Sequence, residues 1–552
     1  MNKHFKKVVF IILAIGALFI IATVSINSIL KNKLEKFIQE RLPENIASAY
    51  DDITVETFGG SLTVSNASVV ISNTQDKVKH TFINVEKLKI SDISYWNYLV
   101  NDEIHIENIS LENPRILYYQ DLQTPSKDST RNPVARIYKP ISVDRVQIKN
   151  TRLAIYEKGK DSTKIYATGL TVELNDILVD NKTVLRKIPF NYKNVEATSD
   201  TVFVKVGKYE NLTVEEFSIK NNNAIFKNLN LKTKYSKREL SRIITKERDH
   251  YDLSVKSLSI ADFDFGFKQN RFFAKSRMIS VNTPSLEIYR DKLVADDPKI
   301  KPLYSKMLRD LPFELTVDSL TITDAKIRYE ERQKPENMGG SINFENLNAA
   351  ISNVSNTYKS PTKTDIKVSA NFMNDTPLTA DWSFDVQNPN DQFIFKADVG
   401  LLVADKLDSF TEPNLKINLN GEVDKTYFTI SGEKTASIID MKINYNDFSI
   451  SILNKEGKEE KKVLSAIANL FIKKNSEKDG ENFREGRGHV TPDNTKSFFN
   501  YLWLNIKEGL LRSITGVPDK VDRAKNKETK KAARNERRAE RKKERLANRD
   551  NH

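Results

Sequence analysis

Cysteine is absent from this 552-residue chain, and its absence excludes disulfide frameworks, thiolate metal sites and cysteine nucleophiles. Glycine and proline are also scarce, at 18 and 17 residues, roughly half of their usual combined share. Few positions are therefore left for glycine-rich loops that hold phosphates, which disfavours a nucleotide-dependent enzyme. Apolar residues make up 39% of the chain, enough for a hydrophobic core, so wholesale disorder is excluded as well.

The sequence also lacks motifs for catalysis or metal binding. None of the six histidines stands at metal-ligand spacing from another, and neither GxSxG nor GxxxxGK[ST] occurs. We expect His105 on the solvated face of a strand and His489 in a glycine-rich loop, REGRGHVTPD, before a helix. A glycosidase-type carboxylate pair stays open, because its members would be distant in the chain. We predict no catalytic residue, no metal ligand, no cofactor and no enzymatic activity.

Positive charge is concentrated at the C-terminus. Residues 519–552 hold 14 Lys and Arg against 7 Asp and Glu, which accounts for +7 of the net charge of +13. A disordered or single-helix segment is the first interpretation of this basic charged tail, because Glu536, Glu540 and Glu544 form i, i+4 charge patterns without an apolar stripe. Binding to anionic headgroups is the second, and nucleic-acid binding, which would require a cytoplasmic tail, is the third. The rest of the chain is near neutral, and we predict no nucleic-acid partner.

An apolar run follows a short basic N-terminus of residues 1–7. Residues 8–26 carry no charge, and 19 helical residues cover about 28 Å, close to the thickness of the bilayer core. Cleaved signal peptides have shorter apolar regions, so we expect an uncleaved transmembrane anchor at residues 8–28. Basic residues flank the run on both sides and do not decide its orientation. The short N-terminus favours a cytoplasmic start and a body outside the cytoplasm.

Beyond the anchor the hydrophobic period changes along the chain. Residues 29–50 have helical spacing up to Pro43, which predicts an amphipathic helix. From Ile53 the period becomes two, as in Ile53-Thr-Val55 and Leu62-Thr-Val64, and this alternation continues to Leu453 with short helical interruptions at 95–98 and 303–308. Because we see no helical crossovers, we expect antiparallel pairing.

The β-rich part repeats itself. The segment ISLENPRILYYQD from Ile109 matches ISVNTPSLEIYRD from Ile279, at an offset of 170 residues. The segment ISVDRVQIKNTRLAIYE from Ile141 matches LTVDSLTITDAKIRYEE from Leu315, at offsets of 173 to 174. We therefore expect two copies of one module, at residues 51–250 and 251–455. Chance similarity among alternating strands is the alternative.

Residues 87–121, KLKISDISYWNYLVNDEIHIENISLENPRILYYQD, resemble the start of the AsmA-like family, envelope proteins related to TamB. Residues 401–432 are similar to the C-terminal AsmA-like segment, and the N-terminal apolar run fits the same family. The resemblance covers most of the chain and rests mainly on strand periodicity. It implies an inner-membrane anchor, a curved β-groove in the periplasm, and a role in outer-membrane biogenesis or lipid transport.

Three phenylalanines alternate along one predicted strand: Phe263, Phe265 and Phe267 share a face, which is either packed core or a lipid-facing wall. Two amphipathic helices are expected within residues 456–518, at 461–474 and 494–514. The second should align Phe499, Leu502, Trp503, Ile506, Leu510 and Ile514, with Asn494 or Thr495 as N-cap and Gly516 at its end. Trp503, Lys507 and Arg512 would suit a membrane interface, and docking on the sheet is the other interpretation.

The sequence thus predicts a mainly β fold: one N-terminal transmembrane helix, an elongated, curved, groove-like antiparallel sheet with internal duplication, and a helical C-terminus. As function we expect a single-pass inner-membrane protein, with most of the chain in the periplasm, that binds or passes phospholipid acyl chains. The alternative is a non-catalytic envelope scaffold with a closed β core and protein partners. A continuous apolar groove would distinguish the first from the second.

Overall fold

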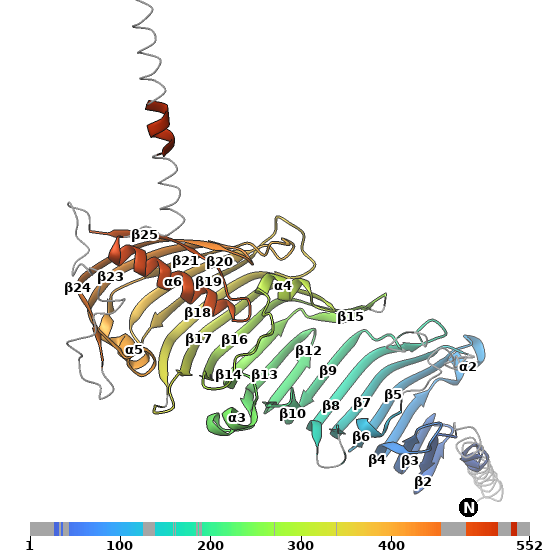
Figure 1. The fold of residues 1–552 in the computed structure, drawn as a ribbon. Helices are drawn as coiled ribbons and strands as arrows, with labels where there is room; N and C mark the ends of the chain where they lie inside the picture. The colour runs from blue at the N-terminus through green and yellow to red at the C-terminus, as the bar shows by residue number, and fades with distance from the viewer. Residues whose placement is uncertain are drawn as a thin grey trace, which may run out of the picture. The chain divides into compact units, whose positions relative to one another are not determined.

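The computed structural model describes residues 27–32, 35–36, 44–124, 139–157, 159, 162–183, 186, 190–269, 271–337, 339–453, 482–516 and 531–537. These residues are mainly β, as predicted. They form two compact units, one of Met1–Lys234 with Ser254–Asn270 and one of Tyr235–Leu253 with Arg271–His552. Each unit is described on its own below (Figure 1).

The first unit is a sheet of mostly short strands with little helix. Its elements are β1 (Ile46–Ala49), β2 (Asp52–Glu56), β3 (Ser61–Ser72), β4 (Lys79–Ile93), α2 (Tyr95–Val100), β5 (Ile104–Glu112), β6 (Arg115–Tyr119), η1 (Gln120–Leu122), β7 (Ile141–Tyr156), β8 (Thr163–Val179), β9 (Asn194–Ser199), β10 (Thr201–Lys205), β11 (Glu210–Val214), β12 (Glu216–Lys220), β13 (Asn223–Thr233), most of β14 (Asp249–Ala261) and β15 (Asp264–Lys268).

The second unit combines longer strands with several short helices and the longer helix α6. Its elements are α3 (Lys237–Ile243), β16 (Arg271–Asp291), α4 (Tyr304–Arg309), β17 (Glu314–Arg332), β18 (Gly340–Ser355), β19 (Thr364–Phe372), β20 (Thr376–Phe384), β21 (Phe393–Val399), β22 (Leu402–Val403), η2 (Ala404–Leu407), α5 (Asp408–Leu415), β23 (Ile417–Gly432), β24 (Ser437–Ile452), β25 (Arg484–Val490) and α6 (Phe498–Thr515).

The prediction of a purely antiparallel sheet is wrong at one place in each unit. In the first unit β5 and β6 both pair with β7 in parallel, and in the second β16 pairs with β17 in parallel. Parallel neighbours need a crossover connection of a dozen or more residues. The β16–β17 link contains α4, and the β6–β7 link runs from residue 120 to residue 140. The sequence predicts the α4 region only as a helical interruption and gives no prediction for the β6–β7 link.

Both units carry the same irregularity in the second strand of the parallel pair, where this strand meets its antiparallel neighbour. The β7–β8 register shifts on each side of Thr151, and the β17–β18 register shifts on each side of Ala325, 174 positions later. The residue just before each bulged position has a left-handed backbone conformation: Asn150 (φ 56°) before Thr151, and Asp324 (φ 54°) before Ala325. Asn and Asp tolerate this region better than other side chains with a Cβ, which explains why they stand at these bulges.

Two predictions from the sequence concern the N-terminal end, the anchor and the helix that follows it. Residues 8–26 of the expected anchor lie outside the described residues, and no helix within the described part of the chain is long and apolar enough to cross a membrane. Residues 27–32 and 35–36 are helical, but Ile46–Ala49 is β1 and pairs with β3. The predicted helix at 29–50 is therefore too long, because pairing with β3 determines the structure of residues 46–49.

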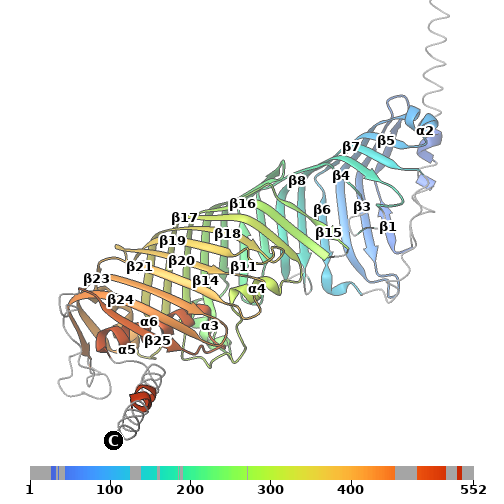
Figure 2. The ribbon, with the colours of Figure 1, turned by 90° about the horizontal axis from the view of Figure 1, so that it is seen from above.

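The C-terminal expectations have mixed outcomes. The expected helix at 461–474 lies outside the described residues, and residues 531–537 of the tail are helical. The helix expected at 494–514 is confirmed as α6, which packs on β24 and β25 (Figure 2). Its N-cap is Ser497, whose Oγ accepts a hydrogen bond from Asn500 N, rather than Asn494 or Thr495. Gly516 ends it in the left-handed conformation, as predicted from glycine at that position.

A candidate apolar binding surface

Strand register in the first unit places apolar side chains in continuous rows across the sheet. One row crosses eight strands, and each member lies directly opposite the next. It consists of Ile53, Val64, Leu88, Leu111, Ile148, Val172, Ala197 and Ile219. A second row, two residues away on each strand, consists of Val55, Leu62, Ile90, Ile109, Val146, Leu174 and Val195. Together these rows are called the first-unit apolar face.

The residues between these two rows are polar and point to the opposite side, because successive side chains alternate across a strand. They consist of Thr54, Thr63, Lys89, Ser110, Gln147, Glu173 and Glu196. Gln147 Nε2 donates to Glu173 Oε2 at 2.8 Å, and Arg145 lies 3.4 Å from Glu173 Oε1. These contacts hold the pKa of the Glu173 carboxyl below its ordinary value, so the carboxylate stays charged. The two faces of this sheet are therefore chemically distinct.

The first-unit apolar face is only partly shielded from water. All seven side chains of the second row are half-buried, whereas the first row reaches full burial at Ile53 and a few other members. Among the described residues of this unit the helical segments are short, namely residues 27–36 in part, α2 and η1. Figure 1 shows the blue and teal strands of this unit side by side. A long apolar surface is thus left half-buried, and part of its second row packs against the cluster of Ile106, Val143 and Ile177.

The second unit has equivalent rows, and here a helix covers the part formed by β20 to β25, whereas Leu320, Ile322 and Ile351 on β17 and β18 stay half-buried. One row consists of Leu320, Ile351, Ile366, Trp382, Phe395, Ile430, Ile439 and Gly488, and the other of Ile322, Ala349, Val368, Ala380, Ala397, Phe428, Met441 and Gly486. Phe498, Tyr501 and Leu502 of α6 join the buried cluster that contains Phe428 and Ile430. The Phe498 ring stacks on Trp382 with centroids 4.3 Å apart.

Glycine lets α6 lie directly on the sheet. A Cβ on Gly486 would lie 2.4 Å from Ser513 N and 2.7 Å from Gly509 O, and a Cβ on Gly488 would lie 2.4 Å from Glu508 Cγ. A Cβ on Gly509 of the helix would likewise lie only 3.0 Å from Ile439 Cδ1 and from Met441 Cε. The sequence REGRGHV, which we had expected to be a loop, is β25, and its glycines serve helix packing rather than turn formation.

A buried ion-pair network fixes the segment that leads into α6. The Glu247 side chain is 1% exposed, and its oxygens accept hydrogen bonds from Lys292 Nζ at 2.5 Å and Lys496 Nζ at 2.9 Å. Lys496 also lies 2.7 Å from Asp296. Burial alone would raise the pKa of Glu247, but the two lysines outweigh it and hold the pKa below its ordinary value. Glu247 therefore remains a carboxylate that joins three parts of the second unit.

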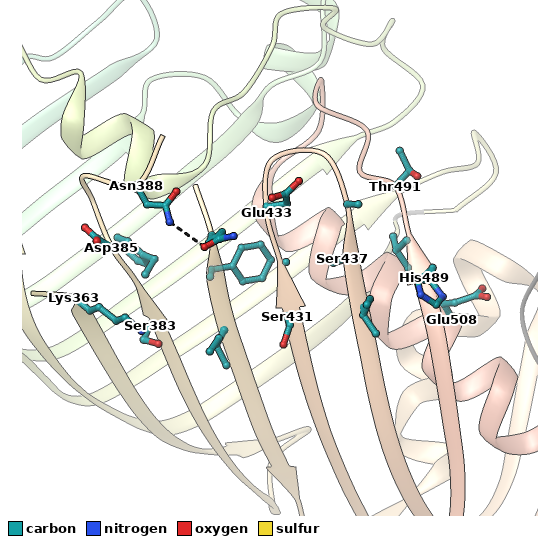
Figure 3. A pocket seen from close by; sticks show the side chains of 18 of the residues that line it. Lys363, Ser383, Asp385, Asn388, Ser431, Glu433, Ser437, His489, Thr491 and Glu508 are labelled. Carbon is teal, nitrogen blue, oxygen red and sulfur yellow. Dashed lines mark hydrogen bonds between the residues drawn. The ribbon is translucent and has the colours of Figure 1, made fainter. Parts of the chain in front are cut away.

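A cleft of about 940 Å³ lies beside α6 in the second unit, lined by strand ends of β20, β21, β23, β24 and β25. His489 and Glu508 face it side by side (Figure 3). Glu508 Oε1 accepts hydrogen bonds from Arg512 Nε at 2.8 Å and Nη2 at 2.6 Å. The cleft thus combines a charged rim with apolar strand ends. Within the described residues no group of acidic and histidine side chains could hold a metal ion.

The residues predicted to face lipid are partly exposed. Phe265 and Phe267 on β15 are 43% and 44% exposed, Phe263 is half-buried, and the rings of Phe263 and Phe265 stack with centroids 5.8 Å apart. His105 is half-buried on β5, where Nδ1 lies 3.0 Å from Ser142 Oγ and Nε2 3.6 Å from Asp144. Whether the phenylalanines meet lipid stays a prediction.

The predicted apolar stripe of α6 is rotated. Phe499 and Trp503, expected on the packed side, are 64% and 47% exposed, whereas Asn505 is fully buried and bonded to Ser437 Oγ at 2.7 Å. Lys507 is exposed, and Arg512 is bound to Glu508. Spacing alone could not find the packed side, because small and polar residues at Asn505, Gly509 and Ser513 occupy it.

Sequence reasoning missed the exposed character of α2. The helix has no buried residue, and Trp96 and Leu99 are 70% and 78% exposed. The available signal was the uncharged hexapeptide YWNYLV, which we had treated only as a helical interruption. In comparisons with known proteins, no family model matches the chain and no curated protein matches it.

Proposed function

We propose that this protein is a single-pass, membrane-anchored envelope protein of the AsmA-like type, which binds or passes phospholipid acyl chains along the first-unit apolar face. The observation that carries the proposal is the pair of unbroken apolar rows, most of whose members are only half-buried. Seven strands spaced about 4.8 Å apart give a row of about 29 Å, roughly twice the depth of one bilayer leaflet. An acyl chain therefore fits lengthwise along a row.

Acyl-chain binding at this face would be passive. Each methylene group removed from water contributes about 0.8 kcal/mol, so a chain laid against the apolar rows is held without a polar contact. Lipid headgroups would stay outside, where water solvates them. A surface of this kind requires no catalytic residue, no metal and no cofactor, in agreement with the expectation from the sequence.

The matching bulges at Thr151 and Ala325 support internal duplication of one module. The two copies would then have diverged in their covering. The second unit acquired α6 over part of its apolar rows, and the first unit kept most members of its rows half-buried. This division assigns lipid binding to the first unit and leaves the second as a closed β core.

The closed second unit favours a second candidate function, an envelope scaffold that binds protein partners. Under that function the first-unit apolar face would be covered by protein rather than by lipid. The anchor at residues 8–28, the inner-membrane location and the periplasmic body are common to both candidates. The nature of the molecule on the first-unit apolar face separates them.

Site-specific photo-crosslinking in cells separates the two functions. A benzophenone amino acid is placed at Ile148, on the apolar face, and in a matched variant at Lys149, the next residue of β7 on the polar side. Lipid acyl transport predicts phospholipid adducts at position 148 and none at 149. Protein adducts without lipid at position 148 would establish the scaffold function instead.

A further inference from the structure

Large apolar side chains gather at one end of the first unit, around α2. Five of its six residues, Tyr95, Trp96, Tyr98, Leu99 and Val100, are between 48% and 78% exposed, and the helix contains no charged residue. Phe58, in the β2–β3 turn, is 61% exposed. Single exposed apolar residues are ordinary on protein surfaces, but a cluster of this size marks an interaction site. Phe58 and α2 together are called the α2 patch.

Thr57 connects the α2 patch to the start of the described chain. Its N and Oγ1 donate to Asn27 Oδ1 at 2.8 and 2.5 Å, and its carbonyl oxygen accepts a hydrogen bond from Tyr95 Oη at 2.6 Å. A second contact, Lys31 Nζ to Asp52 Oδ1 at 2.7 Å, holds the same helical segment against β2. Asn27 and α2 are therefore fixed to one strand end through a single residue.

Asn27 is also the residue at which the long apolar run ends. The 19 uncharged residues 8–26 precede it directly, and as a helix they match the bilayer core at about 28 Å. If the run spans the membrane, as the proposed function requires, Asn27 lies at the bilayer surface. The Asn27–Thr57–Tyr95 contacts then bring the α2 patch to the same surface.

The composition of the patch matches the interfacial zone of a bilayer. Trp and Tyr concentrate there because their rings combine an apolar body with a polar tip. Lys139 stands at the rim, with Nζ 3.7 Å from the centre of the Tyr98 ring, 2.8 Å from Tyr98 O and 3.1 Å from Asp102. A cation beside an uncharged aromatic helix is a typical arrangement at the level of lipid headgroups.

We propose that the α2 patch inserts into the lipid interface beside the anchor and holds the first strands of the first unit at the membrane surface. The inference rests on the proposed anchor, but it assigns a contact that the anchor alone does not provide. Insertion of α2 fixes the orientation of the first unit to the bilayer, since two attachment points prevent rotation about a single helix. The ends of the apolar rows at β2 and β3 then begin close to the lipid.

The absence of cysteine allows a direct test on the full chain. Leu99→Cys places one thiol at the most exposed position of α2, and Lys149→Cys places one on the polar side of β7 as a matched control. Both variants are labelled with an environment-sensitive NBD dye and reconstituted into phosphatidylethanolamine–phosphatidylglycerol vesicles. We expect blue-shifted emission and quenching by spin-labelled lipid at position 99, and neither effect at position 149.

Resistance of the same protein to carbonate extraction, measured in parallel, tests the anchor itself. An extractable chain would overturn the anchor and, with it, the inference. A chain that resists extraction but shows unquenched dye at position 99 would overturn the α2 contact alone and leave the anchor standing. Crosslinking between two copies through position 99, with no lipid quenching, would also overturn it and identify a second copy of this chain as the occupant.

Discussion

Replacing Gly486 by alanine should loosen α6 from the second-unit sheet. The added Cβ would lie 2.4 Å from the backbone N of Ser513 and 2.7 Å from Gly509 O, well inside contact distance. Backbone atoms cannot rotate away as side chains do, so β25 and α6 must separate. Overpacking of this kind costs about 1–3 kcal/mol, which corresponds to a rise in the opening of the helix by a factor between about 5 and about 150.

The chain offers a graded control series for this substitution. At Gly488 the new Cβ would meet only the flexible Glu508 side chain, so Gly488→Ala should cost less than Gly486→Ala. At Gly59 the nearest atom is 3.7 Å away, and Gly59→Ala should change little. Hydrogen exchange of peptides from residues 498–515 measures the opening of α6 in each variant. Equal exchange in all three variants would refute the packing argument.

Three further predictions concern charge, backbone and the apolar face. Glu247→Gln should destabilise the second unit by about 2 kcal/mol, since Lys292 and Lys496 lose their charge-assisted hydrogen bonds to a buried carboxylate and keep only the exposed Asp296, and urea unfolding measures the loss. The lowered pKa of Glu247 predicts that its contribution to the stability of the second unit is complete above pH 4.5 and is lost as the pH falls through its folded pKa. Between pH 6 and pH 3 the native protein should therefore lose more stability than Glu247→Gln does, and equal losses in the two proteins would argue against the network. Asp324→Ala should cost about 1–2 kcal/mol at its left-handed backbone and Asp324→Gly almost nothing, so equal melting temperatures would contradict the bulge account. Ile109→Ser removes apolar surface from the second row and should reduce lipid adducts formed at position 148 while the far-UV spectrum stays unchanged; full adduct yield in the folded variant would place the acyl chain elsewhere.

The sequence was a good guide wherever structure follows local pattern. Alternation predicted the strands, YWNYLV and the residues near 303–308 predicted α2 and α4, and the apolar spacing before Gly516 predicted α6. The repeat offset of 174 residues also matched the positions of the two bulges, since Asn150 and Asp324 are local conformational signals.

Non-local properties could not be found in this way. Which strands pair in parallel depends on crossovers whose path is not encoded in alternation, and so the parallel pairing of β7 with β5 and of β17 with β16 was not predicted. The packed side of α6 depends on the glycines of β25 and also on strand residues such as Phe393 and Ile430, which are far from α6 in the chain. The apolar rows emerge only from register across many strands, and no single segment reveals them.

The central claim is that the first-unit apolar face is open to lipid while α6 closes the part of the equivalent second-unit rows that β20 to β25 form. A benzophenone amino acid at Val146 and, in a separate variant, at Phe428 tests it in one experiment, because both residues lie on apolar rows. We predict phospholipid adducts at position 146 and only intramolecular protein adducts at position 428. Lipid adducts at both positions, or at neither, would contradict the account.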